Sequence, residues 1–155
     1  YKNLWDVPNL LLQKFPSDKF TSTVKFSFKP DERFVGERAG LLVMGMDYAM
    51  LSIEKTKEGF TISQDECISA DKGKAEVKNE TISVRQSDVF FRVNVGTEAM
   101  CSFSYSLDGK KFIRIGKPFK AREGKWIGAK VGVFCSRPIS NNDGGRMEID
   151  WFRID

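Results

Sequence analysis

Alternation of apolar and polar residues is the clearest pattern along this chain. In the segment FTSTVKFSFK, Phe20, Phe26 and Phe28 fall on one side of an extended backbone, whereas threonine, lysine and serine fall mainly on the other. This period of two residues is typical of an antiparallel strand with one buried face. Pro30 follows the segment and cannot donate a ladder hydrogen bond. The pattern therefore predicts a strand over residues 20–29.

Further segments with strand character follow at short spacing, and no segment has a convincing helical period. They are AGLLVMGM (39–46), AMLSIEK (49–55), DVFFRVNVG (88–96), CSFSYSLDGKKFIRIG (101–116) and RMEIDWFRI (146–154). Asp108 and Gly109 supply the positive φ angles of a tight turn, so the fourth segment is predicted to be a hairpin. Residues 64–80 are rich in charge and are predicted to form a long loop or irregular strand with a short helical turn. Roughly seven to nine short strands predict an all-β antiparallel sandwich.

The segment REGKWIGAKVGVFC has an unusual face. Its apolar positions alternate like those of a strand, but Gly128 and Gly132 lie on the opposite face, preceded there by Trp126. Glycine inside a strand often marks a place where another group approaches closely. That group is either a sugar stacked on Trp126 or another part of the protein, such as an aromatic side chain from the Phe90 or Phe152 face or a loop of a partner domain. We favour packing over a sugar site.

Length and composition place the chain among globular domains. Its 155 residues are expected to form a single domain, 1–155, and its net charge is +4, from 25 basic and 21 acidic residues. The basic residues are scattered, so no nucleic-acid partner is expected. No apolar run is long enough for a membrane span, so no membrane partner is expected either. The chain starts at Tyr1 with neither an initiator methionine nor a signal peptide, so we expect a fragment of a longer protein.

Three cysteines, Cys67, Cys101 and Cys135, are too few and too widely spaced for a disulfide scaffold or a thiolate zinc site. We expect them to be free thiols. Cys101 and Cys135 fall on the apolar side of their segments and are predicted to face the core as small apolar residues.

The absence of histidine narrows the candidate chemistry to carboxylates. Neither Ser-His nor Cys-His nucleophilic catalysis is available without it, whereas glycoside hydrolysis needs only a pair of carboxylates. Glu148 and Asp150 alternate in MEIDWF and are expected to project from one face of a strand. Their spacing resembles half of the E-x-D-x-(x)-E signature of sandwich-fold glucanases, but Phe152 occupies the next position on that face. We therefore favour an Asp150 that pairs with a basic neighbour or a backbone amide over a catalytic or metal-binding one.

Candidate sugar-binding residues lie near loops or on non-core faces. Flat aromatic rings stack on sugar rings while neighbouring polar groups fix the orientation. The candidate carbohydrate contacts are Trp126, Tyr48, Phe34, Trp5 and Lys130.

Calcium is the candidate metal ion, because loops of sandwich domains often hold hard cations through oxygen ligands. The segment SNNDGG offers such oxygens, with Asp143 as its carboxylate, and Asp150 is a second candidate ligand. The spacing of an EF-hand is absent, so we favour a solvated turn at this segment.

Several ordered motifs resemble one known family. NLWDVPNLLLQKFP, ERAGLLVMGMDYAMLSIEK, FSYSLDGKKF, AREGKWIGAKVGVFC and DGGRMEIDWFRI span residues 3–154. They are similar to the C-terminal concanavalin A-like sandwich of family 43 glycoside hydrolases of the β-xylosidase and α-L-arabinofuranosidase type. The resemblance implies a jelly-roll accessory domain of an enzyme that acts on plant hemicellulose, xylan or arabinan side chains, and that is periplasmic or secreted. It also implies a missing partner, the N-terminal propeller domain that carries the catalytic carboxylates in that family.

The resemblance carries further expectations. Sandwiches of this family begin further upstream, with a W-x-W-like strand that is not found here, so we expect the first strands to be lacking. An exposed strand edge or apolar groove would then favour self-association. In some relatives an aromatic loop residue helps to close the active-site pocket, and Phe34 and Tyr48 are candidates for it. Two alternatives remain open: an autonomous carbohydrate-binding module that binds oligosaccharide, and a sandwich-fold glucanase that uses Glu148 and Asp150.

Overall fold

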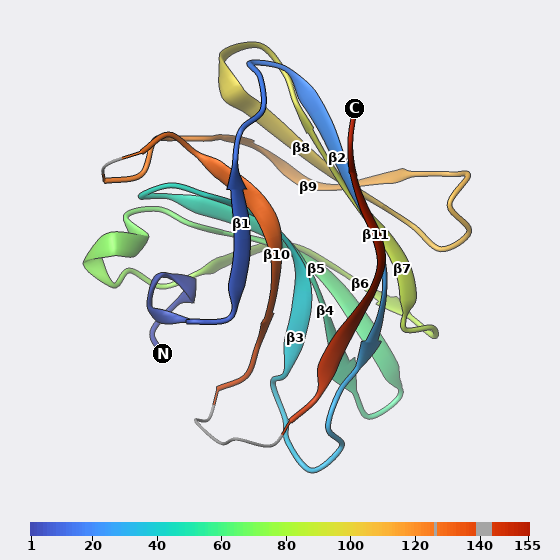
Figure 1. Ribbon diagram of the computed structural model, residues 1–155. Helices are drawn as coiled ribbons and strands as arrows, with labels where there is room; N and C mark the ends of the chain where they lie inside the picture. Colours follow the sequence, from blue (N-terminus) through green and yellow to red (C-terminus); the bar gives the residue numbers. More distant parts are fainter. Residues whose placement is uncertain (126, 139–143) are drawn as a thin grey trace.

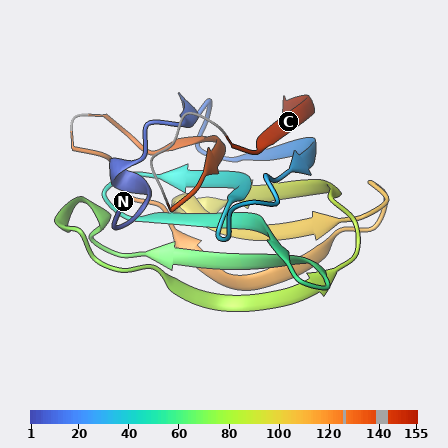
Figure 2. The ribbon, with the colours of Figure 1, turned by 90° about the horizontal axis from the view of Figure 1, so that it is seen from below.

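The chain folds into two antiparallel sheets that pack face to face (Figures 1 and 2). The computed structural model describes residues 1–125, 127–138 and 144–155. The six-stranded sheet has the order β1-β10-β3-β4-β5-β6, and the five-stranded sheet has the order β11-β2-β7-β8-β9. The antiparallel sandwich predicted from the alternating pattern is confirmed.

The strands and short helices have the following bounds. The strands are β1 (Leu10–Lys14), β2 (Phe20–Lys29), β3 (Arg38–Met44), β4 (Tyr48–Thr56), β5 (Gly59–Cys67), β6 (Val77–Val84), β7 (Asp88–Val95), β8 (Met100–Ser106), β9 (Ile113–Lys120), β10 (Lys130–Ser136) and β11 (Arg146–Ile154). The short 3-10 helices are η1 (Leu4–Asp6), η2 (Ala70–Lys72) and η3 (Thr97–Ala99).

The main core lies between the inner faces of the two sheets. On the five-stranded side, Phe26 of β2 packs edge-on against Phe91 of β7, with ring centroids 5.1 Å apart. On the six-stranded side, Leu41, Leu51 and Val131 are fully buried. Each such side chain contributes about 1.5–3 kcal/mol when it leaves water. The alternation of residues 20–29 therefore determines which side chains of β2 enter this core.

The segment 64–80, predicted to be a long loop or irregular strand, contains strand at both ends, and the register of β5 shifts between Gln64 and Asp65. Strand β5 continues through Cys67 and β6 begins at Val77, so only the part around η2 is irregular. The predicted short helical turn is η2. Gln64 and Asp65 are 0% and 3% exposed although they are polar. Polar residues at buried strand positions interrupt the alternation of apolar and polar residues. The sequence pattern therefore did not show that β5 continues to Cys67.

Gly132 of β10 and Gly128, which precedes that strand, lie in different surroundings. A Cβ atom at Gly132 would lie 2.0 Å from the backbone oxygen of Leu11 and 2.8 Å from the Cα of Leu12. The group that approaches Gly132 is therefore another part of the protein, as favoured from the sequence, but it is the backbone of β1 and not an aromatic side chain from the Phe90 or Phe152 face. Gly128 has no described atom within 4 Å of a Cβ position. Of these two glycines, only Gly132 is required by close packing.

The N-terminal segment covers part of the outer face of the six-stranded sheet. Leu4 of η1 and Val7 pack against Tyr48, Met50 and Phe134 and form a second apolar cluster. This cluster explains why β3 and β4 are apolar on both faces. Within the described residues, no helix is long and apolar enough to cross a membrane.

Candidate functional site: a groove along the open side of the sandwich

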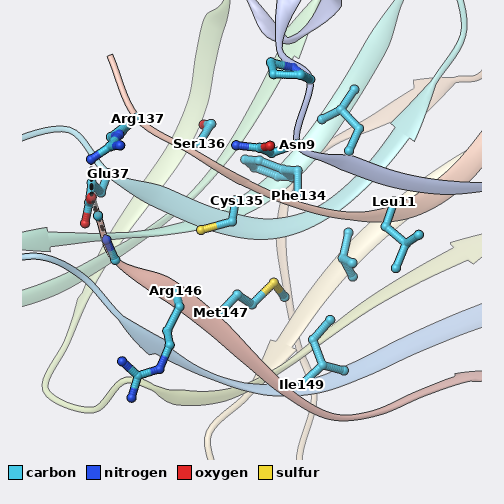
Figure 3. A pocket seen from close by; sticks show the side chains of 15 residues that line it. Asn9, Leu11, Glu37, Phe134, Cys135, Ser136, Arg137, Arg146, Met147 and Ile149 are labelled. Atoms are coloured by element: carbon cyan, nitrogen blue, oxygen red, sulfur yellow. Dashed lines mark hydrogen bonds and ion pairs between the residues drawn. The ribbon is translucent and has the colours of Figure 1, made fainter. Parts of the chain in front are cut away.

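The groove lies where the edges of the two sheets meet. Strand β1 ends the six-stranded sheet and β11 ends the five-stranded sheet, and both face the same side of the molecule. The hollow between them has a volume of about 630 Å³ (Figure 3). A second hollow of about 350 Å³ continues it and shares Leu11, Val133 and Ile149 with the first. We call the two hollows together the lateral groove.

The walls of the lateral groove are mainly apolar. The side chain of Leu11 from β1 is 73% exposed and that of Ile149 from β11 is 41% exposed. Met147 and Phe152 of β11 line it and are half-buried. In the described residues β1 and β11 each pair with one neighbouring strand only, so each keeps a row of backbone groups without a strand partner. Apolar side chains beside free strand edges favour association with another polypeptide segment.

The polar end of the lateral groove is organised around Glu37, which is 4% exposed (Figure 3). The backbone N–H of Gly145 donates to its Oε1 at 2.9 Å, and that of Asp31 donates to its Oε2 at 2.5 Å. Nη1 of Arg137 lies 4.0 Å from Oε1. A Cβ atom at Gly145 would lie 2.4 Å from Oε2 and 2.6 Å from the backbone Cα of Pro30, so this position must be glycine. A buried carboxylate needs such partners, and Glu37 thereby ties the loop before β3 to the start of β11.

Cys135 lies on the floor of the groove but is not a nucleophile at neutral pH. Burial raises the pKa of its thiol to about 11, and the carboxylate of Glu37 adds to that rise. The thiolate is the reactive form of cysteine. Cys67, Cys101 and Cys135 are all free thiols, as predicted, and Cys101 is buried in the main core.

Glu148 and Asp150 have separate basic partners. Nε of Arg146 donates to Oε1 of Glu148 at 2.8 Å, and Nζ of Lys25 lies 2.9 Å from Oδ2 of Asp150. Both carboxylates are exposed. The register between β11 and β2 shifts between Ile149 and Trp151, so Asp150 is the extra residue of a β-bulge. The preferred pairing of Asp150 with a basic neighbour is confirmed, and the arrangement has no buried carboxyl of the kind that serves as a general acid.

Two of the predicted carbohydrate contacts lie under or near the N-terminal segment. Tyr48 is 0% exposed, so its ring face is closed to a sugar. Its hydroxyl accepts from the backbone N–H of Leu4 at 3.0 Å and donates to Glu76, and burial raises its pKa above the usual range. Trp5 is half-buried and lines an open hollow of about 540 Å³ together with Lys72.

The other predicted contacts are scattered. Phe34 lies in the loop between β2 and β3, with the guanidinium carbons of Arg33 and Arg137 at 5.4 and 5.3 Å from its ring centroid. Lys130 begins β10 and pairs with Lys14 and Met44 in register. Trp126 lies outside the described residues. The described candidates therefore do not meet in one sugar site.

The metal predictions are not resolved by the described residues. Asp143 lies outside them, and Asp150 is paired with Lys25. Across residues 1–125, 127–138 and 144–155, no group of three or more Cys, Asp or Glu side chains could hold a metal ion.

Sequence reasoning missed Glu37, Leu11 and Ile149 as site residues. The adjacent glycines Gly144 and Gly145 were the available signal for a close approach near Glu37, and they were interpreted only as part of a turn. Leu11 and Ile149 look like ordinary members of apolar strands. Their exposure depends on which strands end the sheets, and that order is set by long-range pairing.

Comparison with known proteins supports the resemblance. The family described as the beta-xylosidase C-terminal concanavalin A-like domain matches residues 2–155. A curated protein named Beta-xylosidase, from Formosa agariphila, is 36% identical over 70 residues, which cover 44% of this chain and 11% of that protein.

Solved structures share the fold. The bifunctional GH43-CE protein of Bacteroides eggerthii has a TM-score of 0.84 at 19% identity, over 100% of this chain and 21% of that one. The GH43 BlXynB protein of Bacillus licheniformis has a TM-score of 0.76 at 20% identity, over 98% and 30%. A xylan beta-1,4-xylosidase from Bacillus halodurans has a TM-score of 0.76 at 15% identity, over 94% and 29%.

The chain thus spans 30% or less of these three enzymes and 11% of the curated relative. It is similar to one part of longer GH43 enzymes, and the match over residues 2–155 covers nearly all of the chain. The chain therefore belongs to the family of beta-xylosidase C-terminal concanavalin A-like domains.

Proposed function

We propose that the chain is a non-catalytic accessory domain of a family 43 glycoside hydrolase that acts on plant hemicellulose. In this proposal the lateral groove is the surface that contacts the rest of the parent enzyme and supports its propeller. The observation that carries the proposal is the pair of free strand edges, β1 and β11, which flank exposed Leu11 and Ile149. The related enzymes extend far beyond the region similar to this chain, so a partner segment is available in a parent of that kind.

The test uses the whole parent enzyme with one substitution in the lateral groove. Ile149→Lys places a charge on the apolar wall, so we expect weaker contact between the domains. The midpoint of thermal inactivation should fall by about 2–4 °C, as expected for a loss near 1 kcal/mol in a domain of this size, and proteolysis between the domains should become faster.

The matched control is Leu107→Lys. Leu107 is 41% exposed, as is Ile149, but it lies after β8, away from the groove. Equal thermal inactivation of the two variants would overturn the assignment of the groove.

The isolated chain tests the glucanase alternative. Incubated with xylan, arabinoxylan and laminarin, it should release no reducing sugar. Turnover that Glu148→Gln abolishes would show instead that the sandwich is itself a hydrolase.

A further inference from the structure

The outer face of the five-stranded sheet carries arginines in a single cross-strand row. Arg153 of β11 stands opposite Thr23 of β2, and Thr23 stands opposite Arg92 of β7. Arg92 is followed by Ser104 of β8, which stands opposite Arg114 of β9. Figure 1 shows these strands side by side. We call Arg153, Arg92 and Arg114 the arginine row.

Each guanidinium of the arginine row is held in place by a neutral group. The guanidinium carbon of Arg92 lies 3.6 Å from the ring centroid of Phe112, and its Nε donates to Oγ1 of Thr23 at 2.9 Å. The guanidinium carbon of Arg153 lies 4.0 Å from the ring of Trp151. Nη2 of Arg114 donates to the hydroxyl of Ser102 at 2.9 Å. Stacking on a ring fixes an arginine and leaves in-plane N–H donors for a ligand.

None of these arginines has a carboxylate within ion-pair distance among the described residues, whereas most other arginines of the chain do. Those with a carboxylate partner are Arg33, Arg38, Arg122, Arg137 and Arg146. The carboxylates of this face lie in neighbouring rows: Glu148 and Asp88 stand opposite Ser27, Asp150 pairs with Lys25, and Asp155 stands beside Thr21. The arginine row is therefore a line of positive charges without a direct ion-pair partner in the described part of the chain.

The neighbouring row supplies aromatic surface. Trp151 stands opposite Lys25, which stands opposite Phe90, and the rings of Trp151 and Phe90 are 6.0 Å apart. Phe112 reaches the same patch from the β8–β9 connection, with its ring centroid 6.4 Å from that of Phe90. Aromatic rings beside positive charge suit a ligand with apolar sugar faces and acidic groups.

We infer that the arginine row binds the carboxylates of a uronic-acid-bearing xylan chain lying across the strands. Adjacent strands are about 4.8 Å apart, so successive arginines, two strands apart, stand about 10 Å from one another along the row. A xylan chain with uronic acid side groups presents carboxylates at intervals along its length and can meet more than one arginine of such a row. The choice of xylan rests on the proposed function, whereas the recognition of carboxylates rests on the arginine row alone.

The experiment measures binding of the isolated chain to glucuronoxylan by affinity gel electrophoresis and calorimetry. We expect binding that weakens as salt rises from about 0.05 M to about 0.3 M, because exposed charges are screened. Glucuronoxylan whose carboxyl groups have been reduced to alcohols should bind at least tenfold more weakly. Arg114→Gln and Arg153→Gln should each weaken binding about two- to fivefold, as expected for one exposed ion pair.

Arg85→Gln is the matched control. Arg85 is exposed, lies between β6 and β7 outside the row, and has no carboxylate within ion-pair distance in the described part of the chain. This variant changes the net charge equally and should bind like the unaltered chain. Arg114 and Arg153 are both exposed, so their variants are expected to remain folded, and circular dichroism verifies this.

Several outcomes would overturn the inference. They are no binding to glucuronoxylan, equal binding to the carboxyl-reduced polysaccharide, and equal weakening by Arg85→Gln. Competition by single-stranded DNA as effective as that by glucuronoxylan would likewise replace it with a general polyanion surface. The thermal inactivation of the Ile149→Lys parent enzyme does not depend on the arginine row, so failure of this inference is distinguishable from failure of the proposed function.

Discussion

Arginines on the outer faces of the two sheets have different partners. On the six-stranded sheet, the guanidinium of Arg38 forms two hydrogen bonds with the carboxylate of Glu76, at 2.7 and 2.8 Å, beside the covering N-terminal segment. On the five-stranded sheet, the guanidinium groups of Arg92, Arg114 and Arg153 have rings and hydroxyls as partners and form no ion pair among the described residues. A charge that is withdrawn from water needs an opposite charge. An arginine that remains in water without one is available for a ligand.

The covered face should be the more sensitive to truncation of an apolar side chain. Leu4 is 1% exposed and packs on the outer cluster, so we expect Leu4→Ala to lower the free energy of unfolding by about 3 kcal/mol. Urea denaturation measures this. The control is Leu11→Ala on the open side, which should cost less than about 1 kcal/mol because its side chain is 73% exposed. Similar losses would show that the N-terminal segment does not cover the sheet.

The paired charge of the covered face should be the next most sensitive. Glu76→Gln leaves Arg38 without its carboxylate and weakens the acceptor of the Tyr48 hydroxyl. We expect a loss of about 2 kcal/mol in the free energy of unfolding. Glu148→Gln breaks an exposed ion pair with Arg146 and should cost less than about 0.5 kcal/mol. Equal costs in urea denaturation would contradict the contrast between the faces.

Asp65 is an exception on the covered sheet and gives a pH-dependent prediction. Its side chain is 5% exposed, and its Oδ1 has no hydrogen-bond partner in the part of the chain that the structure describes. Burial raises its pKa above the ordinary value of 3.8. The charged form therefore opposes folding once the pH rises above 3.8. Asp65→Asn should stabilise the fold by about 1 kcal/mol at neutral pH.

That gain should shrink as the pH falls below 3.8, because the wild-type carboxyl is then neutral in both states. Thermal melts of both proteins at several pH values measure it. A gain that is constant with pH would mean that the Asp65 carboxylate is not the source.

The arginine row should have the smallest effect on stability. Arg114→Gln and Arg153→Gln remove exposed side chains that have no ion pair among the described residues, so the free energy of unfolding should change by less than about 0.5 kcal/mol. Urea denaturation of each variant tests this against the Glu76→Gln loss. A loss near 2 kcal/mol would show that these arginines stabilise the fold as much as the Arg38–Glu76 pair of the covered face does.

Local sequence patterns predicted where the strands lie better than they predicted where the strands begin and end. Period two located β2 and β7, and Asp108 marked the connection between β8 and β9, where its carboxylate accepts from the backbone of Lys110 at 2.8 Å. The connection is longer than a tight two-residue turn. Buried Gln64 hid the continuation of β5, because a polar residue in the interior resembles a loop residue in sequence.

The candidate sites were harder to predict because they depend on neighbours that are distant in sequence. Tyr48 resembles a loop aromatic in sequence, but the N-terminal segment encloses it. Arg92 and Arg153 come from separate strands, and only the pairing of both with Thr23 places them in one row. Neither fact follows from the local order of residues.

The pairing of β1 with β10 in the six-stranded sheet requires a residue without a side chain at position 132. With any side chain at this position, the backbone of β1 could not stay beside β10. Strand β10, which contains buried Val131 and Val133, would then become the outermost strand. A long apolar strand in that position is a template for intermolecular pairing. A single substitution at Gly132 should therefore act less through a local loss of stability than by exposing a strand edge that promotes aggregation.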